Sequence, residues 1–204
     1  MSEASPTHRE EPLPTAVRWA QTMLQSRLRK GDIVVDATAG NGHDSLFLAQ
    51  QVLPGGQLFI FDVQAEALRQ TRVRLTENEV PLDAVTFLHA GHETLDTALP
   101  ETLRGKVRAI MFNLGYLPGG DKQLITQSTT TLTALQAALG WLDTDGLLTV
   151  VAYPGHDGGR EEALALEDWM RALPVDRFEA QKIAYLNFRP TTPFCLVVRK
   201  KTER

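Results

Sequence analysis

The sequence predicts an α/β fold, a doubly wound sheet of seven strands that is parallel except for one antiparallel strand near the C-terminus. Two observations predict this fold. Between residues 15 and 173, apolar strand-like runs alternate with helical segments, the order that gives a parallel sheet covered by helices on both faces. After Pro174, only "RPTT" (189–192) separates two further strand-like runs. A crossover between parallel strands needs about a dozen residues, so these two must pair antiparallel.

The elements of the first half follow in order. A helix is expected from Thr15 to Leu28, because its apolar residues recur at helical spacing and Gly31 follows its basic end. "DIVVDA" (32–37) has the continuous apolar character of a buried strand, and a helix from Asp44 to Leu53 ends at "PGG". The next elements are the strand "QLFIFDV" (57–63), a helix over 64–79, the strand "AVTFLHA" (84–90) and a short helical stretch over 92–99.

The second half continues the alternation and then breaks it. "KVRAIMFNL" (106–114) is the fourth strand, and a long helix over 122–142 is expected to end at "DTDG" (143–146). The remaining elements are the strand "LLTVVAYP" (147–154), a helix over 159–173, and the antiparallel strands "FEAQKIAYLNF" (178–188) and "PFCLVVRKK" (193–201). No linker follows Pro14, which predicts a disordered tail over residues 1–13 and a single domain over residues 14–204.

Length and composition narrow the class of protein. The chain has 204 residues, 43% of them hydrophobic, enough for one domain with a sizeable core. No stretch approaches the roughly 18 unbroken apolar residues of a membrane span, and the polar first dozen residues lack the core of a secretory signal. The single cysteine, Cys195, excludes an internal disulfide and a cysteine-cluster metal site. We therefore expect a cytoplasmic protein with no membrane or metal partner. The net charge of −4 neither supports nor excludes an RNA substrate.

"DATAGNGHD" (36–44) joins the first strand to a helix, and Gly40 and Gly42 let the backbone turn tightly beneath a ligand. We expect a side chain at Gly42 to occupy the space of that ligand. The first amides of the helix favour a carboxylate, such as that of S-adenosylmethionine (SAM). Asp36 is placed to meet the amino group of the same cofactor, directly or through water. Asp44 is interpreted either as the N-cap of the helix or as a ligand contact.

The next two strand ends predict the rest of an adenosine site. Asp62 ends the second strand, where an acidic side chain accepts hydrogen bonds from the ribose of either NAD or SAM. The third strand ends in "HAGHE" (89–93), with Gly91 and His92 where an adenine edge could lie. His92 is equally interpreted as a structural hydrogen-bonding residue. The predicted cofactor-binding residues are Asp36, Thr38, Gly40, Asn41, Gly42, Asp44, Asp62, Val63, Gln64, Gly91, His92 and Asn113.

The fourth strand ends in "NLGY" (113–116), which favours methyl transfer to nitrogen. Amino-group methyltransferases commonly have Asn-Pro-Pro-Tyr at this place. An Asn side-chain oxygen and a following carbonyl can hold the N–H bonds of the acceptor and turn its lone pair toward the sulfonium methyl. Asn113 and Tyr116 keep this spacing, and a tyrosine there can lie flat against a planar base. The alternative is that Asn113 only caps a turn.

The chain resembles the family known as "putative rRNA methylases", which are class I SAM-dependent methyltransferases with a Rossmann-like fold. The resemblance spans roughly residues 14–200 and rests on "DATAGNGHD", "GHE", "MFNLGYLPGGDK", "YPGHDGGREE" and the terminal Asn-then-Pro-Phe pattern. Characterised members methylate the aminomethyl group of 5-aminomethyl-2-thiouridine at the tRNA wobble position. The resemblance therefore implies SAM as cofactor, tRNA as substrate and tRNA modification as function. A homodimer is also possible.

A primary alkylamine is mostly protonated at neutral pH and must lose a proton before it attacks carbon. The candidate proton acceptors are Asp121, Tyr153 and His156, among which the sequence does not choose. Asp121 joins Asn113 and Tyr116 as a predicted catalytic residue. The predicted substrate-binding residues are Tyr116, Lys122, Tyr153 and His156. Lys122 either meets a phosphate or bonds its own loop, and "GHDGG" (155–159) can also be an ordinary turn.

Three other functions compete with this interpretation. A nicotinamide-dependent oxidoreductase is disfavoured, because "GNGHD" lacks the third glycine of Gly-x-Gly-x-x-Gly and the terminal hairpin departs from an all-parallel sheet. A non-catalytic subunit with the same fold is disfavoured by the presence of both Asn113 and Tyr116. A methyltransferase of rRNA or of a small-molecule or protein amine remains open, since the acidic composition carries no RNA signature.

Overall fold

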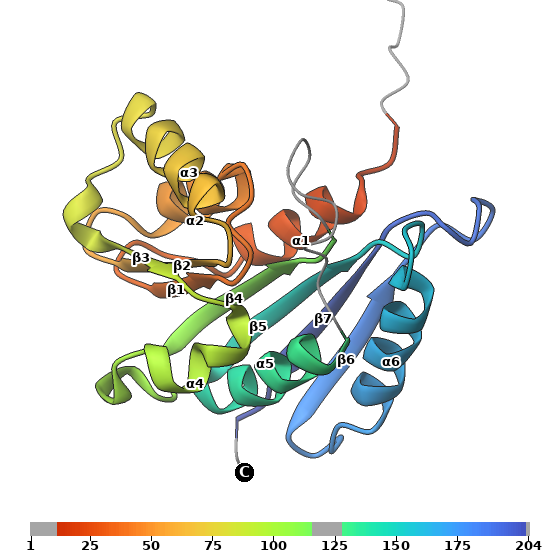
Figure 1. Ribbon diagram of the computed structural model, residues 1–204. Helices are drawn as coiled ribbons and strands as arrows, with labels where there is room; N and C mark the ends of the chain where they lie inside the picture. The colour runs from red at the N-terminus through yellow and green to blue at the C-terminus, as the bar shows by residue number, and fades with distance from the viewer. Residues whose placement is uncertain (1–11, 116–127, 203–204) are drawn as a thin grey trace, which may run out of the picture.

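The computed structural model describes residues 12–115 and 128–202. Its centre is one seven-stranded sheet in the order β3-β2-β1-β4-β5-β7-β6 (Figure 1). The pairs among β1 to β5 are all parallel, whereas β7 runs antiparallel to both β5 and β6. The predicted doubly wound sheet with one reversed strand is therefore confirmed.

The elements follow the predicted order. The strands are β1 Ile33–Asp36, β2 Gln57–Asp62, β3 Val85–His89, β4 Val107–Asn113, β5 Leu142–Ala152, β6 Phe178–Ile183 and β7 Phe194–Lys200. The α-helices are α1 Ala16–Gln25, α2 His43–Val52, α3 Ala65–Glu77, α4 Leu95–Ala98, α5 Ser128–Trp141 and α6 Gly159–Arg171. Short 3₁₀ turns cover Leu82–Ala84, His92–Thr94 and Glu101–Leu103. Of the helix predicted over 122–142, residues 122–127 lie outside the described residues.

Helices cover both faces of the sheet, α1 to α3 on one side and α4 to α6 on the other (Figure 1). The strands alternate accordingly: in β4, Ala109 and Met111 pack with α1 to α3, and Ile110 and Phe112 pack with α4 to α6. All four side chains are completely buried. Burial on both faces explains why the central strands are continuous apolar runs rather than alternating ones.

The first helix is shorter than predicted. It begins after Thr15, whose hydroxyl accepts a hydrogen bond from the Arg18 N–H, and it ends at Gln25 instead of Leu28. The carbonyl of Leu24 accepts from the N–H groups of both Arg27 and Leu28, which closes the last turn. Leu28 stays buried although it lies beyond the helix. Helical spacing of apolar residues therefore identified the buried face and overestimated the length of the helix.

Two strand boundaries also differ from the prediction. β5 begins at Leu142, which pairs with Val107, and the register then jumps so that Ala109 pairs with Leu147. The predicted turn "DTDG" forms an irregularity within this strand, with Asp145 at φ 61°. The strand predicted over 178–188 ends at Ile183, because its partner β7 begins only at Phe194, and residues 184–193 form a loop. Within the two described ranges, no helix has the length and apolar character needed to cross a bilayer.

Candidate active site

The carboxyl ends of β1, β2, β4 and β5 lie at one edge of the sheet and bring together Asp36, Asp62, Asn113 and Tyr153. β1 pairs with both β2 and β4, so the strand order reverses between β1 and β4. Ligands of doubly wound sheets bind at such a point, outside the carboxyl ends of the strands. The sequence-predicted residues of four separate strands thus meet at the expected place.

The glycine loop between β1 and α2 is held by neighbouring strand ends. The Gly40 N–H donates to Asp62 Oδ2 at 2.9 Å, which ties the loop to β2. The Asn113 N–H donates to Thr38 Oγ1 at 2.7 Å, which ties it to β4. Gly40 has φ 52°, in the left-handed region that favours glycine. Bonds within the protein itself therefore define the shape of this loop.

Gly42 is required for a reason that differs from the expected one. Its φ is 77°, and a Cβ added there would lie 2.8 Å from the Cα of Thr71 in α3. Nearby, Arg74 of α3 donates to the Asn41 carbonyl at 2.6 Å. The prediction that a side chain at Gly42 would fill the ligand's space is wrong, because the side chain would collide with the backbone of α3. Close packing of α2 against α3 selects glycine here.

Asp36 is a fully buried carboxylate. It accepts hydrogen bonds from the Thr38 N–H at 3.1 Å and from the Ser45 hydroxyl at 2.5 Å. Burial raises its pKa to about 7, and the negative charge of nearby Asp44 adds to the increase. The two hydrogen bonds oppose this shift without cancelling it. Asp36 therefore exists as a mixture of acid and carboxylate near neutral pH, and a nearby cation would favour the carboxylate.

Asp44 is not the N-cap of α2, which is Gly42. Its side chain is buried, and each oxygen accepts one hydrogen bond from a neutral amide: Oδ1 from Gln21 Nε2 at 2.9 Å and Oδ2 from Asn113 Nδ2 at 2.9 Å. A carboxylate can only accept, so the NH₂ group of Asn113 must face Asp44. The carbonyl oxygen of the Asn113 side chain is consequently turned away from Asp44. The capping interpretation of Asp44 is wrong, and its link to Asn113 was not predicted.

Tyr153 follows β5 and lies beside the same amide. Burial raises the pKa of its hydroxyl, the charge of Asp44 raises it further, and a hydrogen bond with the Asn113 side chain lowers it by less. The ring also lies next to the neighbouring loop, since a Cβ added to Gly115 would be in ordinary van der Waals contact with it at 3.7 Å. Gly115 has φ 123°, which proline cannot adopt. This backbone conformation is incompatible with proline at position 115, one of the two proline positions of Asn-Pro-Pro-Tyr.

His92 lies against the end of β1. Burial lowers the pKa of its imidazole, and its ring meets the Phe112 ring edge-on with 5.6 Å between centroids. Its Nε2 atom is buried and has no hydrogen-bond partner among the described residues. A buried polar nitrogen left unpaired fits a ligand contact. Next to it, the carboxylate of Glu93 folds over Gly91, where an added Cβ would lie 2.2 Å from its Oε2.

The contacts of the remaining predicted site residues do not indicate a role for their side chains. The ring of His156 bonds within its own turn, with Nδ1 2.9 Å from the Asp157 carbonyl. Gln64 donates its backbone N–H to Asp62, and Val63 is exposed beside it. Three predicted site residues, Tyr116, Asp121 and Lys122, lie outside the described residues.

Sequence reasoning missed Gln21, Ser45 and Arg74, which hold Asp44, Asp36 and Asn41. Gln21 carried a usable signal. It lies four residues after Val17 and three before Leu24, on the apolar face of α1, where a polar side chain needs a buried partner. Ser45 and Arg74 had no comparable signal.

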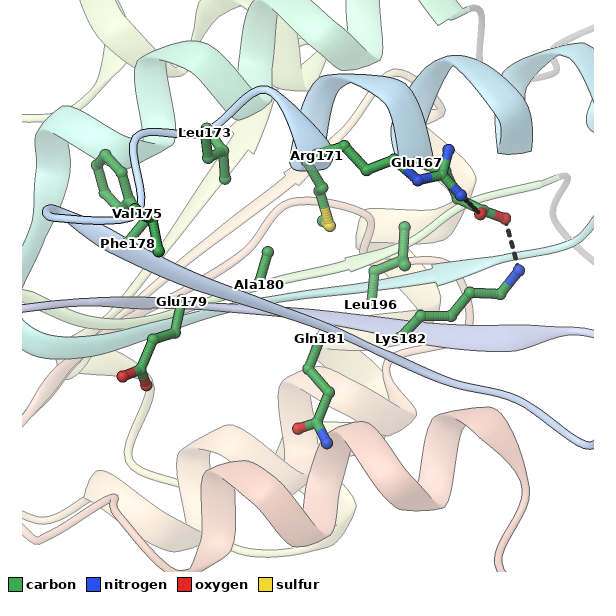
Figure 2. Close-up of a pocket in the computed structure, with 11 residues that line it drawn as sticks. Glu167, Arg171, Leu173, Val175, Phe178, Glu179, Ala180, Gln181, Lys182 and Leu196 are labelled. Carbon is green, nitrogen blue, oxygen red and sulfur yellow. Dashed lines mark hydrogen bonds and ion pairs between the residues drawn. The ribbon is translucent and has the colours of Figure 1, made fainter.

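A separate groove lies between α6 and β6, shown in Figure 2. Its lining is mostly apolar and is crossed by an ion pair between Glu167 and Lys182 at 2.5 Å. None of its residues belongs to the strand ends described above, so it is distinct from the candidate site. Among residues 12–115 and 128–202, no cluster of His, Cys, Asp and Glu could hold a metal ion.

Comparison with known proteins relates this geometry to a family. The family model described as "Putative rRNA methylase" matches residues 58–199 of the chain. A protein of Arabidopsis thaliana, "tRNA (mnm(5)s(2)U34)-methyltransferase, chloroplastic", is 37% identical over 193 residues, which cover 91% of this chain and 69% of the relative.

Solved structures of similar proteins have the same fold. A "putative rRNA-methylase" from Clostridium thermocellum is 34% identical, with a TM-score of 0.87 over 93% of this chain and 100% of that one. A "putative methyltransferase" from Streptococcus mutans, solved in complex with SAH, is 32% identical, with a TM-score of 0.81 over 93% of this chain and 99% of that one.

The raised pKa of Asp36 predicts a pH-dependent stability. Between about pH 4 and 7 the folded protein holds a proton on Asp36 that the unfolded chain releases, so the free energy of unfolding falls as pH rises through this window. Asp36→Asn carries no charge at any pH and should lack this fall. We therefore expect the free energy of unfolding, measured with urea, to fall between pH 5 and pH 8 by on the order of a few kcal/mol more in wild type than in Asp36→Asn. Asp83→Asn, at an exposed position, is the control, and an equal pH response of wild type and Asp36→Asn would contradict the prediction.

Proposed function

Since this chain belongs to the "Putative rRNA methylase" family, we propose that it methylates an amine nitrogen of tRNA with SAM as the methyl donor. The observation that carries the nitrogen acceptor is the orientation of Asn113, whose NH₂ group is held by Asp44. The named tRNA methyltransferase with 37% identity supports tRNA as the substrate. We further propose that residues 14–204 form a single methyltransferase domain.

The charges of the candidate site fit SAM. Asp36, Asp44 and Asp62 surround one glycine loop, and none of them forms an ion pair with another residue in the described parts of the chain. Asp36 and Asp44 are buried, and buried carboxylates are normally paired with cations. SAM carries a sulfonium and an ammonium group, and when bound it supplies the electrophilic methyl group. The charge that the site lacks is therefore the charge that this cofactor brings.

Each strand end takes one part of the cofactor in this proposal. Asp36 and the glycine loop hold the amino-acid part, with Asp36 as the carboxylate that faces the ammonium group. Asp62 keeps free lone pairs beside its bonds to the Gly40 and Gln64 N–H groups and accepts from the ribose. His92 offers its unpaired Nε2 to the adenine side. NAD would instead place its negatively charged pyrophosphate beside the carboxylates of Asp36 and Asp44.

Asn113 positions the methyl acceptor. Its side-chain oxygen accepts an N–H of the substrate amine and thereby turns the nitrogen lone pair forward. This role needs the oxygen, not the NH₂ group, to face the substrate. The hydrogen bond to Asp44 selects that orientation, and the bond from Gln21 fixes Asp44 in turn. Asp44 thus acts as a positioning residue for Asn113.

The proton of the amine needs an acceptor other than Tyr153. Because burial raises the pKa of Tyr153, its hydroxyl stays protonated at neutral pH and is suited to donate a hydrogen bond. Of the three acceptors predicted from the sequence, Asp121 and His156 remain proposals. Tyr153 is better assigned to holding the acceptor or the Asn113 amide in place.

Replacement of Asn113 separates methyl transfer from cofactor binding. Asn113→Ala should lower kcat about 10²- to 10³-fold, because the variant loses an oriented hydrogen bond that forms mainly in the transition state. Loss of such a bond raises the activation free energy by about 2.7–4 kcal/mol. Its effect on SAM affinity should be much smaller, since Asp36 and Asp62 are untouched. Single-turnover methyl transfer and calorimetric SAM titration measure the two effects.

A matched pair at Asp44 tests the orientation of the amide. Asp44→Asn keeps an oxygen that can accept from Asn113 Nδ2, and Gln21 can turn its own oxygen toward the new NH₂ group. Asp44→Ala removes the acceptor. If Asp44 orients Asn113, Asp44→Asn should retain most of the rate and Asp44→Ala should resemble Asn113→Ala. Equal losses in both Asp44 variants would instead assign the role to the negative charge.

The substrate is tested with RNA from cells that lack this gene. Their tRNA carrying 5-aminomethyl-2-thiouridine should accept one methyl group per molecule, and tRNA without the aminomethyl group should accept none, because no amine nitrogen is then presented. Radiolabel transfer followed by nucleoside mass spectrometry measures both. Equal labelling of the two tRNAs would contradict an aminomethyl acceptor. Preferential labelling of ribosomal RNA would favour the activity that the family description names.

A further inference from the structure

The loop over residues 184–193, between β6 and β7, lies at the same edge of the sheet as the candidate site. β6 is antiparallel to β7, and β7 is antiparallel to β5, so β6 and β5 run in the same direction. The end of β6 at Ile183 is therefore at the edge where β1 to β5 end. Figure 1 shows this loop extending past the ends of β5 and β6.

The loop holds two stacked aromatic rings. The rings of Tyr185 and Phe188 have centroids 4.3 Å apart and an interplanar angle of 11°. The Tyr185 hydroxyl donates to the Leu13 carbonyl at 2.6 Å, with the Pro14 carbonyl 3.0 Å away, which fastens this ring to the segment before α1. One face of the Phe188 ring thus packs on the Tyr185 ring, whose hydroxyl is hydrogen-bonded to the segment before α1.

The rest of the loop is exposed and carries an unpaired cation. Phe188 is 56% exposed, and Leu186 beside it is 101% exposed. Arg189 is also exposed, and its guanidinium forms no ion pair or hydrogen bond with any residue in the described parts of the chain. Arginines at the opposite edge of the sheet, such as Arg171 and Arg199, are paired with carboxylates. Large exposed apolar groups next to a free cation mark a binding surface.

The loop also contacts the turn that leads out of the candidate site. A Cβ added to Gly155 would lie 3.1 Å from the Thr191 carbonyl, so the loop packs closely on the turn after β5. That turn begins directly after Tyr153, whose hydroxyl is linked to Asn113. The loop that carries Phe188 and Arg189 therefore packs beside the turn that follows the proposed amine-binding residues.

We propose that Phe188 stacks on a nucleobase of single-stranded RNA next to the nucleotide that is methylated, and that Arg189 contacts a phosphate of the same strand. This inference rests on the proposed function, because it takes RNA as the substrate. Aromatic side chains and arginine are the groups that bind unpaired nucleotides, and stacking needs an open ring face such as that of Phe188. A free cation in a chain of net charge −4 suits a polyanion at this place.

The test compares Phe188→Ala, Phe188→Leu and Phe188→Trp in the full chain, with Val175→Ala as control. Val175 is 78% exposed and precedes β6, at the opposite edge of the sheet. Fluorescence anisotropy measures the affinity for a synthetic anticodon stem–loop, calorimetry the affinity for SAM, and sedimentation the assembly state. Phe188→Ala and Phe188→Leu should weaken RNA binding about 5- to 150-fold, the range for one stacked base, while Phe188→Trp and Val175→Ala bind like wild type. SAM affinity should not change.

Two results would overturn the inference. One is wild-type RNA affinity in both Phe188→Ala and Phe188→Leu. The other is loss of affinity in Phe188→Ala alone together with dissociation of a dimer, which would assign the loop to an interface between two copies of the chain. Failure of the proposed function looks different, because wild type itself would then neither bind the stem–loop nor methylate tRNA.

Discussion

One hydrogen bond, from the Asn113 side-chain amide to the Asp44 carboxylate, links the end of β4 to the start of α2. A second bond, from the Asn113 backbone to the Thr38 hydroxyl, joins the same strand to the glycine loop. β1 and β4 are neighbours at the reversal of strand order, so the loop that would hold the cofactor and the amide that would hold the acceptor are built on adjacent strands. A shift of either group would therefore break or strain these two bonds. In methyl transfer this matters, because donor and acceptor must meet in line and small displacements are costly in rate.

The hydrogen bond between Asn113 and Asp44 also holds the negative charge of Asp44 at a buried position, where no cation of the described residues pairs with it. Asp44 is buried between two neutral amides, and its charge helps to raise the pKa of Asp36 to about 7. Burying carboxylates without cations destabilises a folded chain, and the apolar clusters on both faces of the sheet must offset this. A cofactor that places its sulfonium and ammonium groups beside these carboxylates would remove much of the penalty on binding. Binding and stability are then coupled, so the free protein should be the less stable form.

The sequence was sufficient for the sheet and for the identity of the residues at its edge. Continuous apolar strands, helices between them and a short terminal connection define the topology, and parallel strands bring their carboxyl ends together. Strand lengths were less predictable. β6 stops at Ile183 because its partner begins at Phe194, and the start of β5 at Leu142 depends on pairing with Val107. These limits come from contacts between segments far apart in the chain, which local patterns do not contain.

The orientation of the Asn113 side-chain amide could not be predicted from the sequence for a related reason. Asn113 and Asp44 were both identified as site residues, yet nothing local indicates which end of the Asn113 amide faces the ligand. That choice depends on a carboxylate 69 positions away, and the carboxylate depends on Gln21 in a helix that precedes the first strand. α1 is not one of the crossover helices that connect the strands. It supplies the last partner that Asp44 needs, and so a helix outside the alternating strand–helix pattern determines the direction of the Asn113 amide.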